Sequence, residues 1–164
     1  MNALSRIATF NGPLEAGIRA VSILAAAYPR SYDLQRLVAF DYLLVHTGDI
    51  QGPENLHPPT PMQTAEILVR RKLVEESLLL MMTRDLVSRE VSASGIAYAA
   101  GENAVPFVSS VSAPYLVALN DRARWLVDTL GDYDDTRIRT FMTDFFDHWV
   151  EEFVTPEQSS GAQT

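Results

Sequence analysis

The spacing of apolar residues changes once along this chain of 164 residues, and that change restricts the fold more than any other feature. Apolar side chains recur every three or four residues through most of the sequence, as on one face of an α-helix. Between residues 87 and 99 they alternate with polar or small residues on either side of Ala93-Ser94-Gly95. This alternation predicts a short β-hairpin. The expected fold class is therefore mainly α, with a small β element (α+β).

Three helices are predicted before the hairpin, over residues 13–27, 34–46 and 63–84. One apolar stripe is predicted on the first helix, formed by Leu14, Ile18, Val21, Ala25 and Tyr28. The second helix follows Asp33, a favoured N-cap residue, and is apolar nearly all round, so we expect it to be covered on several sides. The connection over residues 47–62 is rich in proline and is expected to be stiff.

Helices are also predicted after the hairpin, over residues 103–111, 113–130 and 136–154, the second of them capped by Ser112 with Pro114 in its first turn. The order helix, helix, long helix, hairpin is that of a winged helix-turn-helix, with the hairpin as the wing and the third helix in the recognition position. We therefore expect a winged-helix domain over residues 1–111 and a C-terminal helical extension over residues 112–155. The small polar residues 156–164 are expected to be a disordered tail.

Composition and charge exclude several classes of protein. The absence of cysteine excludes disulfide scaffolds, thiolate metal sites and cysteine nucleophiles. Thirteen basic against 21 acidic residues give a net charge of −8, which disfavours broad contact with DNA or with an anionic membrane surface. No run of about 18 apolar residues predicts a membrane span, and no targeting signal is evident, so the expected compartment is the cytoplasm.

The candidates for catalytic chemistry are few. His46 and His57 flank the stiff loop near Asp49, and two histidines with a carboxylate can bind a metal ion. Their spacing matches no metal motif, and hydrogen bonds that pin the loop are the favoured interpretation. Neither a phosphate-binding glycine loop nor a nucleophile elbow is present in the sequence. We therefore expect that the protein is not an enzyme and that it binds no cofactor, no metal and no small-molecule substrate. A metal-dependent enzyme is the weakest of the hypotheses.

Asp41 interrupts the apolar pattern of the second predicted helix. A lone carboxylate among apolar side chains is costly unless it is paired. The sequence predicts a buried structural carboxylate paired with Arg19, Arg70 or Arg71, and a functional carboxylate is the alternative.

Arg70, Arg71 and Lys72 lie in the predicted recognition helix and are the candidate nucleic-acid contacts. Residues 66–90, however, hold five basic and five acidic groups, so their local charge sums to zero. A solvated face whose charges pair with one another is the favoured interpretation, with weak or indirect DNA contact as the alternative.

The apolar residues of the last predicted helix sweep about 180° of its circumference, whereas packing on one core needs only about 100°. Much of the surplus is aromatic, as at the centre of protein interfaces. The candidate partner-binding residues are Phe141, Phe146, Trp149 and Val150. The alternative is a helix wedged between two parts of the same domain.

Several segments resemble, in order and spacing, the middle component of bacterial three-component ABC-ATPase systems. They are Phe10–Gly17, Asp33–Leu37, Asp41–His46, Gly52-Pro53, Leu56–Pro59, Arg70–Val74 and Gly95–Tyr98, and Trp125 is also similar. The resemblance covers roughly residues 10–130. Ala99 departs from it, because a basic residue often follows the tyrosine in that family, and this weakens a DNA contact by the wing.

The resemblance implies a small non-catalytic adaptor that works beside an SMC/Rad50-like ABC ATPase and an effector protein. Such systems are similar to the Lamassu class of anti-phage and anti-plasmid defence, and no catalytic residue is carried over. The alternative function is a winged-helix transcription regulator that binds DNA directly.

Overall fold

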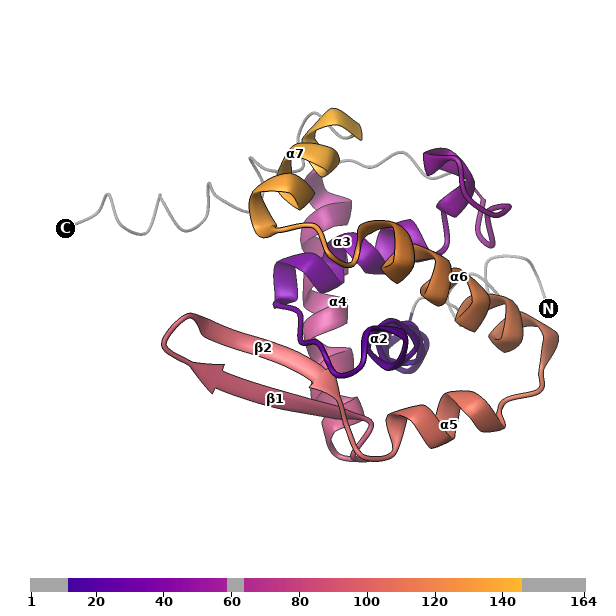
Figure 1. Ribbon diagram of the computed structural model, residues 1–164, viewed down its shortest axis with the longest axis vertical. Helices are drawn as coiled ribbons and strands as arrows, with labels where there is room; N and C mark the ends of the chain where they lie inside the picture. Colours follow the sequence, from indigo (N-terminus) through magenta and orange to yellow (C-terminus); the bar gives the residue numbers. More distant parts are fainter. Residues whose placement is uncertain (1–11, 59–63, 146–164) are drawn as a thin grey trace.

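Helices dominate the computed structural model, which describes residues 12–58 and 64–145. The elements are α2 (Pro13–Ala27), α3 (Leu34–Leu44), the 3-10 helix η1 (Thr47–Ile50), α4 (Thr64–Met82), β1 (Val87–Ser92), β2 (Gly95–Ala100), α5 (Ala104–Ser110), α6 (Pro114–Leu130) and α7 (Asp135–Phe145). The two strands form an antiparallel sheet (Figure 1). The prediction of a mainly helical chain with one small hairpin is confirmed.

Helix α2 lies at the centre of the fold and is seen end-on in Figure 1. It contacts α3, α4, α5, α6 and β2. The predicted apolar stripe is wrong at both ends, because Leu14 and Tyr28 are 57% and 64% exposed. Ile23 and Leu24 are fully buried instead, together with several small residues, and a Cβ added to Gly17 would overlap the side chain of Met81 on α4. A single stripe suits a helix that lies on one core, whereas α2 is surrounded.

Helix α3 is covered on several sides, as its apolar circumference predicts, and every residue from Arg36 to Leu44 is buried. Asp33 is its N-cap, with Oδ1 accepting the backbone N–H of Arg36 at 2.8 Å. The helix ends two residues before the predicted end. The N–H of His46 turns to the carbonyl of Leu43, three residues back, which tightens the last turn and stops the α-helical ladder.

The hairpin is joined to the helical body through Tyr98. The backbone N–H of Tyr32 donates to the carbonyl of Tyr98 at 2.9 Å, and the N–H of Tyr98 donates to the carbonyl of Tyr32 at 2.8 Å. This bridge places the segment between α2 and α3 beside β2. Near the turn, Gly95 has a φ of +118°, which glycine adopts without strain. Val91 is 74% exposed, so the far end of the hairpin projects beyond the core.

The remaining helices pack into the same hydrophobic cluster as α2 and α3. Helix α4 contributes Ile67, Val74, Leu78 and Met81. Helices α6 and α7 contribute Leu119, Leu126, Leu130, Ile138 and Met142. The domain division at residue 112 stays a prediction. Within residues 12–58 and 64–145, no helix combines the length and apolarity that a membrane crossing requires.

Candidate functional site

A buried charge cluster ties three helices together around Asp41 on α3. The Nε of Arg19, on α2, donates to Oδ1 of Asp41 at 2.7 Å. The Nη1 of Arg70, on α4, donates to Oδ2. Burial alone would raise the pKa of Asp41, but the charges and hydrogen bonds of the two guanidinium groups outweigh burial and lower it. Asp41 is therefore a buried, ionised, paired carboxylate.

The same cluster decides where Arg70 points. Its side chain is only 20% exposed, and its guanidinium also lies 5.3 Å from the centre of the Tyr42 ring. Arg71 is half-buried, whereas Lys72 is exposed. Of the three candidate nucleic-acid contacts, Arg70 is thus engaged inside the protein, and only Lys72 lies fully at the surface.

The two loop histidines are held by hydrogen bonds within the protein. His46 places Nδ1 2.9 Å from the carbonyl of Tyr42 and Nε2 3.2 Å from the carbonyl of Pro58, across the loop. His57 places Nε2 2.8 Å from the hydroxyl of Tyr115 on α6. Burial, and then the positive charge of nearby Arg19, lower the pKa of His57 from 6.5 to about 4. These contacts pin the loop between α3 and α6.

The third residue of the weak metal hypothesis, Asp49, accepts a hydrogen bond from Asn55 at 3.0 Å. Among the described residues, no group of three His, Asp or Glu side chains is placed to hold a metal ion. Within the same ranges, every buried side-chain nitrogen or oxygen has a hydrogen-bond partner. The interior polar groups of the described chain are therefore arranged as structural contacts.

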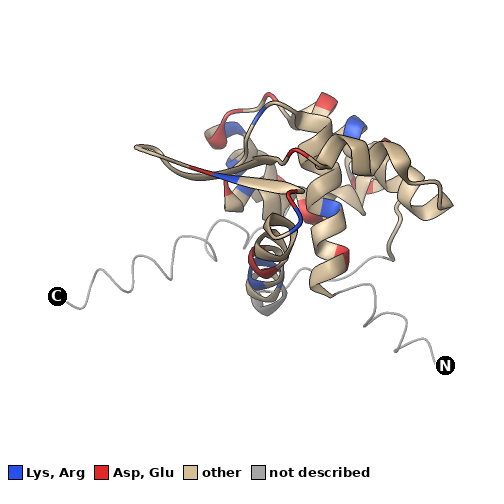
Figure 2. Cartoon of the chain, turned by 90° about the horizontal axis from the view of Figure 1, so that it is seen from below, with Lys and Arg blue, Asp and Glu red and all other residues tan. Residues whose placement is uncertain are grey.

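The outward face of α4 combines apolar and charged side chains. We use this name for Leu68, Val69, Lys72, Glu75, Glu76, Leu79 and Leu80, which are all exposed and recur at helical spacing. The face is about 18 Å long at 1.5 Å per residue, and its net charge is −1. In the view of Figure 2, acidic and basic positions are interspersed over the molecule. Such a face resembles a protein contact more than a phosphate contact.

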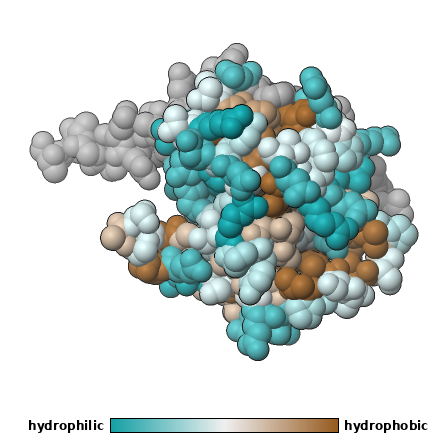
Figure 3. Space-filling model, in the orientation of Figure 1, coloured by the Kyte–Doolittle hydropathy of each residue, from teal (hydrophilic) through white to brown (hydrophobic). Residues whose placement is uncertain are grey.

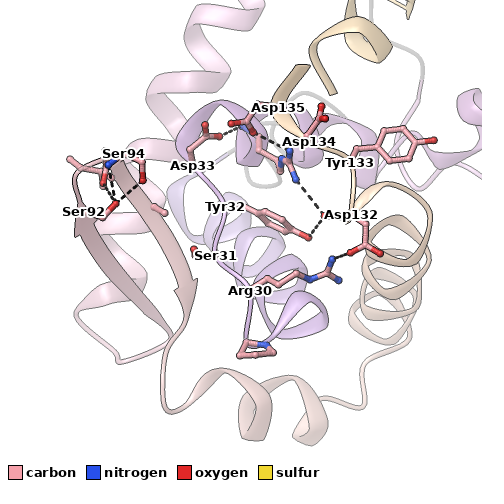
Figure 4. Close-up of a pocket in the computed structure, with 16 residues that line it drawn as sticks. Arg30, Ser31, Tyr32, Asp33, Ser92, Ser94, Asp132, Tyr133, Asp134 and Asp135 are labelled. Atoms are coloured by element: carbon pink, nitrogen blue, oxygen red, sulfur yellow. Dashed lines mark hydrogen bonds and ion pairs between the residues drawn. The ribbon is translucent and has the colours of Figure 1, made fainter. Parts of the chain in front are cut away.

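A cleft of about 750 Å³ lies between the hairpin and the turn that joins α6 to α7. We call this turn, residues 131–135, the corner. The floor of the cleft comes from the segment that enters α3, where the Tyr32 hydroxyl donates to the carbonyl of Gly131 at 3.2 Å (Figure 4). Figure 3 shows the hairpin projecting from the body, with hydrophilic residues gathered across the middle of that face.

Charged side chains line the cleft on the corner side. Arg30 pairs with Asp132, and Arg36 pairs with Asp135 at 3.0 Å. Asp134 accepts the backbone N–H of Arg137 at 2.7 Å and so caps α7. Sequence reasoning missed this cleft, because Gly131-Asp132 indicates only a break between helices. The signal available was the run of three aspartates within four residues.

The candidate partner-binding residues are only partly within the described chain. Phe141 is half-buried and packs against the core, with its ring edge-on to Tyr133 at 6.5 Å between centroids. Phe146, Trp149 and Val150 lie outside the described residues. Their role in partner binding stays a prediction.

Comparison with known proteins gives one family. Residues 9–152 match the family model of the ABC-three component (ABC-3C) system Middle Component 2. Comparisons with curated proteins and with solved structures each found no significant match.

Proposed function

Since the chain belongs to the Middle Component 2 family of ABC-three component systems, we propose that it is a non-catalytic cytoplasmic adaptor that binds the SMC/Rad50-like ABC ATPase of its system. The third component of the system is an effector protein, and the complex acts in anti-phage or anti-plasmid defence of the Lamassu type. The proposed architecture is a winged helix. Its support is the element order, together with the isolated β-bridge Tyr32–Tyr98, which pairs the segment between α2 and α3 with β2.

The observation that carries the adaptor function is the outward face of α4. In the proposed winged helix, α4 is the helix that would read DNA, yet its exposed face presents four large apolar side chains and a net charge of −1. Contact with DNA requires cations that neutralise phosphates. Exposed apolar side chains gathered on one face, in contrast, stabilise a complex when a partner protein covers them and removes them from water.

Co-purification with the ATPase component of the same system tests this function. Val69 and Leu79 are 68% and 51% exposed on the outward face of α4. The double variant Val69→Glu, Leu79→Glu should keep the melting temperature of the isolated chain and lose the ATPase. The matched control is Val117→Glu on α6, another exposed apolar residue, which should keep it. Retention of the ATPase by the double variant would contradict the proposed surface.

The segment over residues 136–154, predicted from the sequence to be a helix, is proposed as a second contact with the ATPase. Alanine variants of Phe141, Phe146, Trp149 and Val150 should separate its two interpretations. A variant that keeps its melting temperature but loses the ATPase supports a partner contact. Unfolding of the isolated chain by all four substitutions would assign these residues to the internal core instead.

A further inference from the structure

The edge of β2 that faces the cleft is open at Ile96. Tyr98 directs its N–H and carbonyl to Tyr32, away from β1. In an antiparallel strand, residues two apart direct these groups to the same edge, so those of Ile96 also point away from β1. Tyr32 cannot be followed by a second pairing residue, because the chain enters α3 at Leu34. No described residue hydrogen-bonds the backbone of Ile96 on this edge.

The open edge and the corner lie on the same side of the sheet. Tyr32 and Tyr98 are directly opposed, so their side chains share a face, and Ile96 shares it because it is two residues from Tyr98. Tyr32 extends from that face to the carbonyl of Gly131 in the corner. A residue paired opposite Ile96 would therefore direct its own side chain into the cleft, toward the carboxylates seen in Figure 4.

The charge of the cleft indicates which kind of side chain a residue paired opposite Ile96 would carry. Four carboxylates and two guanidinium groups line it, which gives a net charge of −2; they are Asp33, Asp132, Asp134, Asp135, Arg30 and Arg36. The carboxylates of Asp132 and Asp135 are 90% and 73% exposed, so each keeps accessible oxygen beside its present partner. A long basic side chain can pack its methylene stem on Ile96, which is 49% exposed, and extend its charged end to the corner.

We propose that this cleft binds an extended, basic segment of a partner protein, which adds a short strand to β2 at Ile96 and directs an arginine or lysine to Asp132 and Asp135. Backbone hydrogen bonds to an open strand edge provide affinity, and alternate side chains provide specificity. Charge complementarity disfavours the C-terminal residues 146–164 of this chain as the occupant, because they hold four acidic and no basic residues. The site is separate from the outward face of α4 and does not depend on it.

The test is an NMR titration of the full isotope-labelled chain with a short capped peptide that alternates threonine with arginine. Saturable shifts are expected at the amides of Ser94 and Ile96 and throughout the corner. Hydrogen exchange of the Ile96 amide should be fast in the free protein and slower with the peptide. A matched peptide that alternates threonine with glutamate should leave these signals unchanged.

Two variants separate the contribution of backbone hydrogen bonds to peptide binding from the contribution of the carboxylate charges. Ile96→Pro removes the outward N–H without removing a β1–β2 hydrogen bond, and it should abolish binding. Asp132→Asn with Asp135→Asn changes only exposed carboxylates and should weaken binding about tenfold. Val117→Ala, on α6, is the control and should bind as the unaltered chain does.

Four results would overturn the proposal. They are equal binding of the glutamate peptide, unchanged affinity in the aspartate variant, shifts confined to another surface, and an Ile96 amide already protected in the free protein. The last result would show that the edge is covered by the chain itself or by a second copy, and light scattering would distinguish these two occupants.

Discussion

Arg19 and Asp41 form a buried ion pair between α2 and α3, with Nε of Arg19 2.7 Å from Oδ1 of Asp41 and side chains only 3% and 2% exposed. Arg70 of α4 completes the cluster from a third helix. The cluster therefore fixes the central helix α2 relative to α3 and α4. Because both charges are removed from water, their contribution to the free energy of unfolding depends on the presence of both partners.

Replacement of Asp41 should strongly destabilise the protein. Asp41→Ala leaves Arg19 buried without its counter-charge, and loss of one partner from such a pair costs about 3–5 kcal/mol. Urea denaturation of the purified chain measures the change. The control is Asp121→Ala, which removes an exposed pair with Arg124 and should cost less than about 1 kcal/mol. Equal, small losses for both variants would contradict burial of the Asp41 cluster.

The free energy of unfolding should decrease as the pH is lowered from 6.5 to about 4, because of His57. Its pKa is lowered in the folded state, so the unfolded chain binds the proton first over this range, and protonation favours unfolding. The contribution is complete above pH 6.5 and is lost as the pH falls toward 4. The melting temperature of His57→Gln should depend less on pH over this window. An NMR titration that places the pKa of His57 near 6.5 would be inconsistent with its burial.

Asp41 adds a second loss of stability at lower pH. Its folded-state pKa lies below the ordinary value of 3.8, so its contribution is present above that value and is lost as the pH falls through the lowered pKa. In Asp41→Asn this loss of stability at low pH should be absent. Melting curves recorded from pH 5 downward compare the two chains, and an identical loss of stability in both would contradict the assignment.

Gly52→Ala should displace the ring of Trp125. A Cβ at this position would overlap the indole of Trp125, which lies on α6. Forcing an extra carbon into such a contact costs about 1–3 kcal/mol. In a Trp149→Phe background, the fluorescence of Trp125 reports the displacement directly. Gly12→Ala is the matched control, because a Cβ there meets nothing within 4 Å, and its spectrum should not change.

The isolated chain should bind duplex DNA weakly. Arg70 is engaged by Asp41, and the outward face of α4 has a net charge of −1, so few phosphates can be neutralised. Gel-shift titration at about 0.1 M salt tests this expectation. Sub-micromolar affinity that falls on Lys72→Ala would favour the transcription-regulator hypothesis over the adaptor.

Local patterns in the sequence predict most of the described elements. The helical spacing locates α2 and α6, and the alternation after residue 87 locates the hairpin, because side-chain periodicity follows directly from backbone geometry. The apolar circumference of α3 also predicts that it is covered on several sides, and its residues from Arg36 to Leu44 are buried. The prediction of a single buried stripe on α2 is wrong at its ends, because residue spacing describes one helix by itself. It carries no information on how many neighbouring elements surround that helix.

The sequence by itself determined the order of helices and hairpin, the family, and the need of Asp41 for a cationic partner, since each depends on local pattern or on the cost of burying a charge. Only the tertiary structure decided which arginines meet that need. It also formed the cleft, whose walls come from Arg30, Ile96 and Asp132, residues far apart in the chain. Such sites arise when packing brings separate elements together, and no local spacing encodes which elements meet.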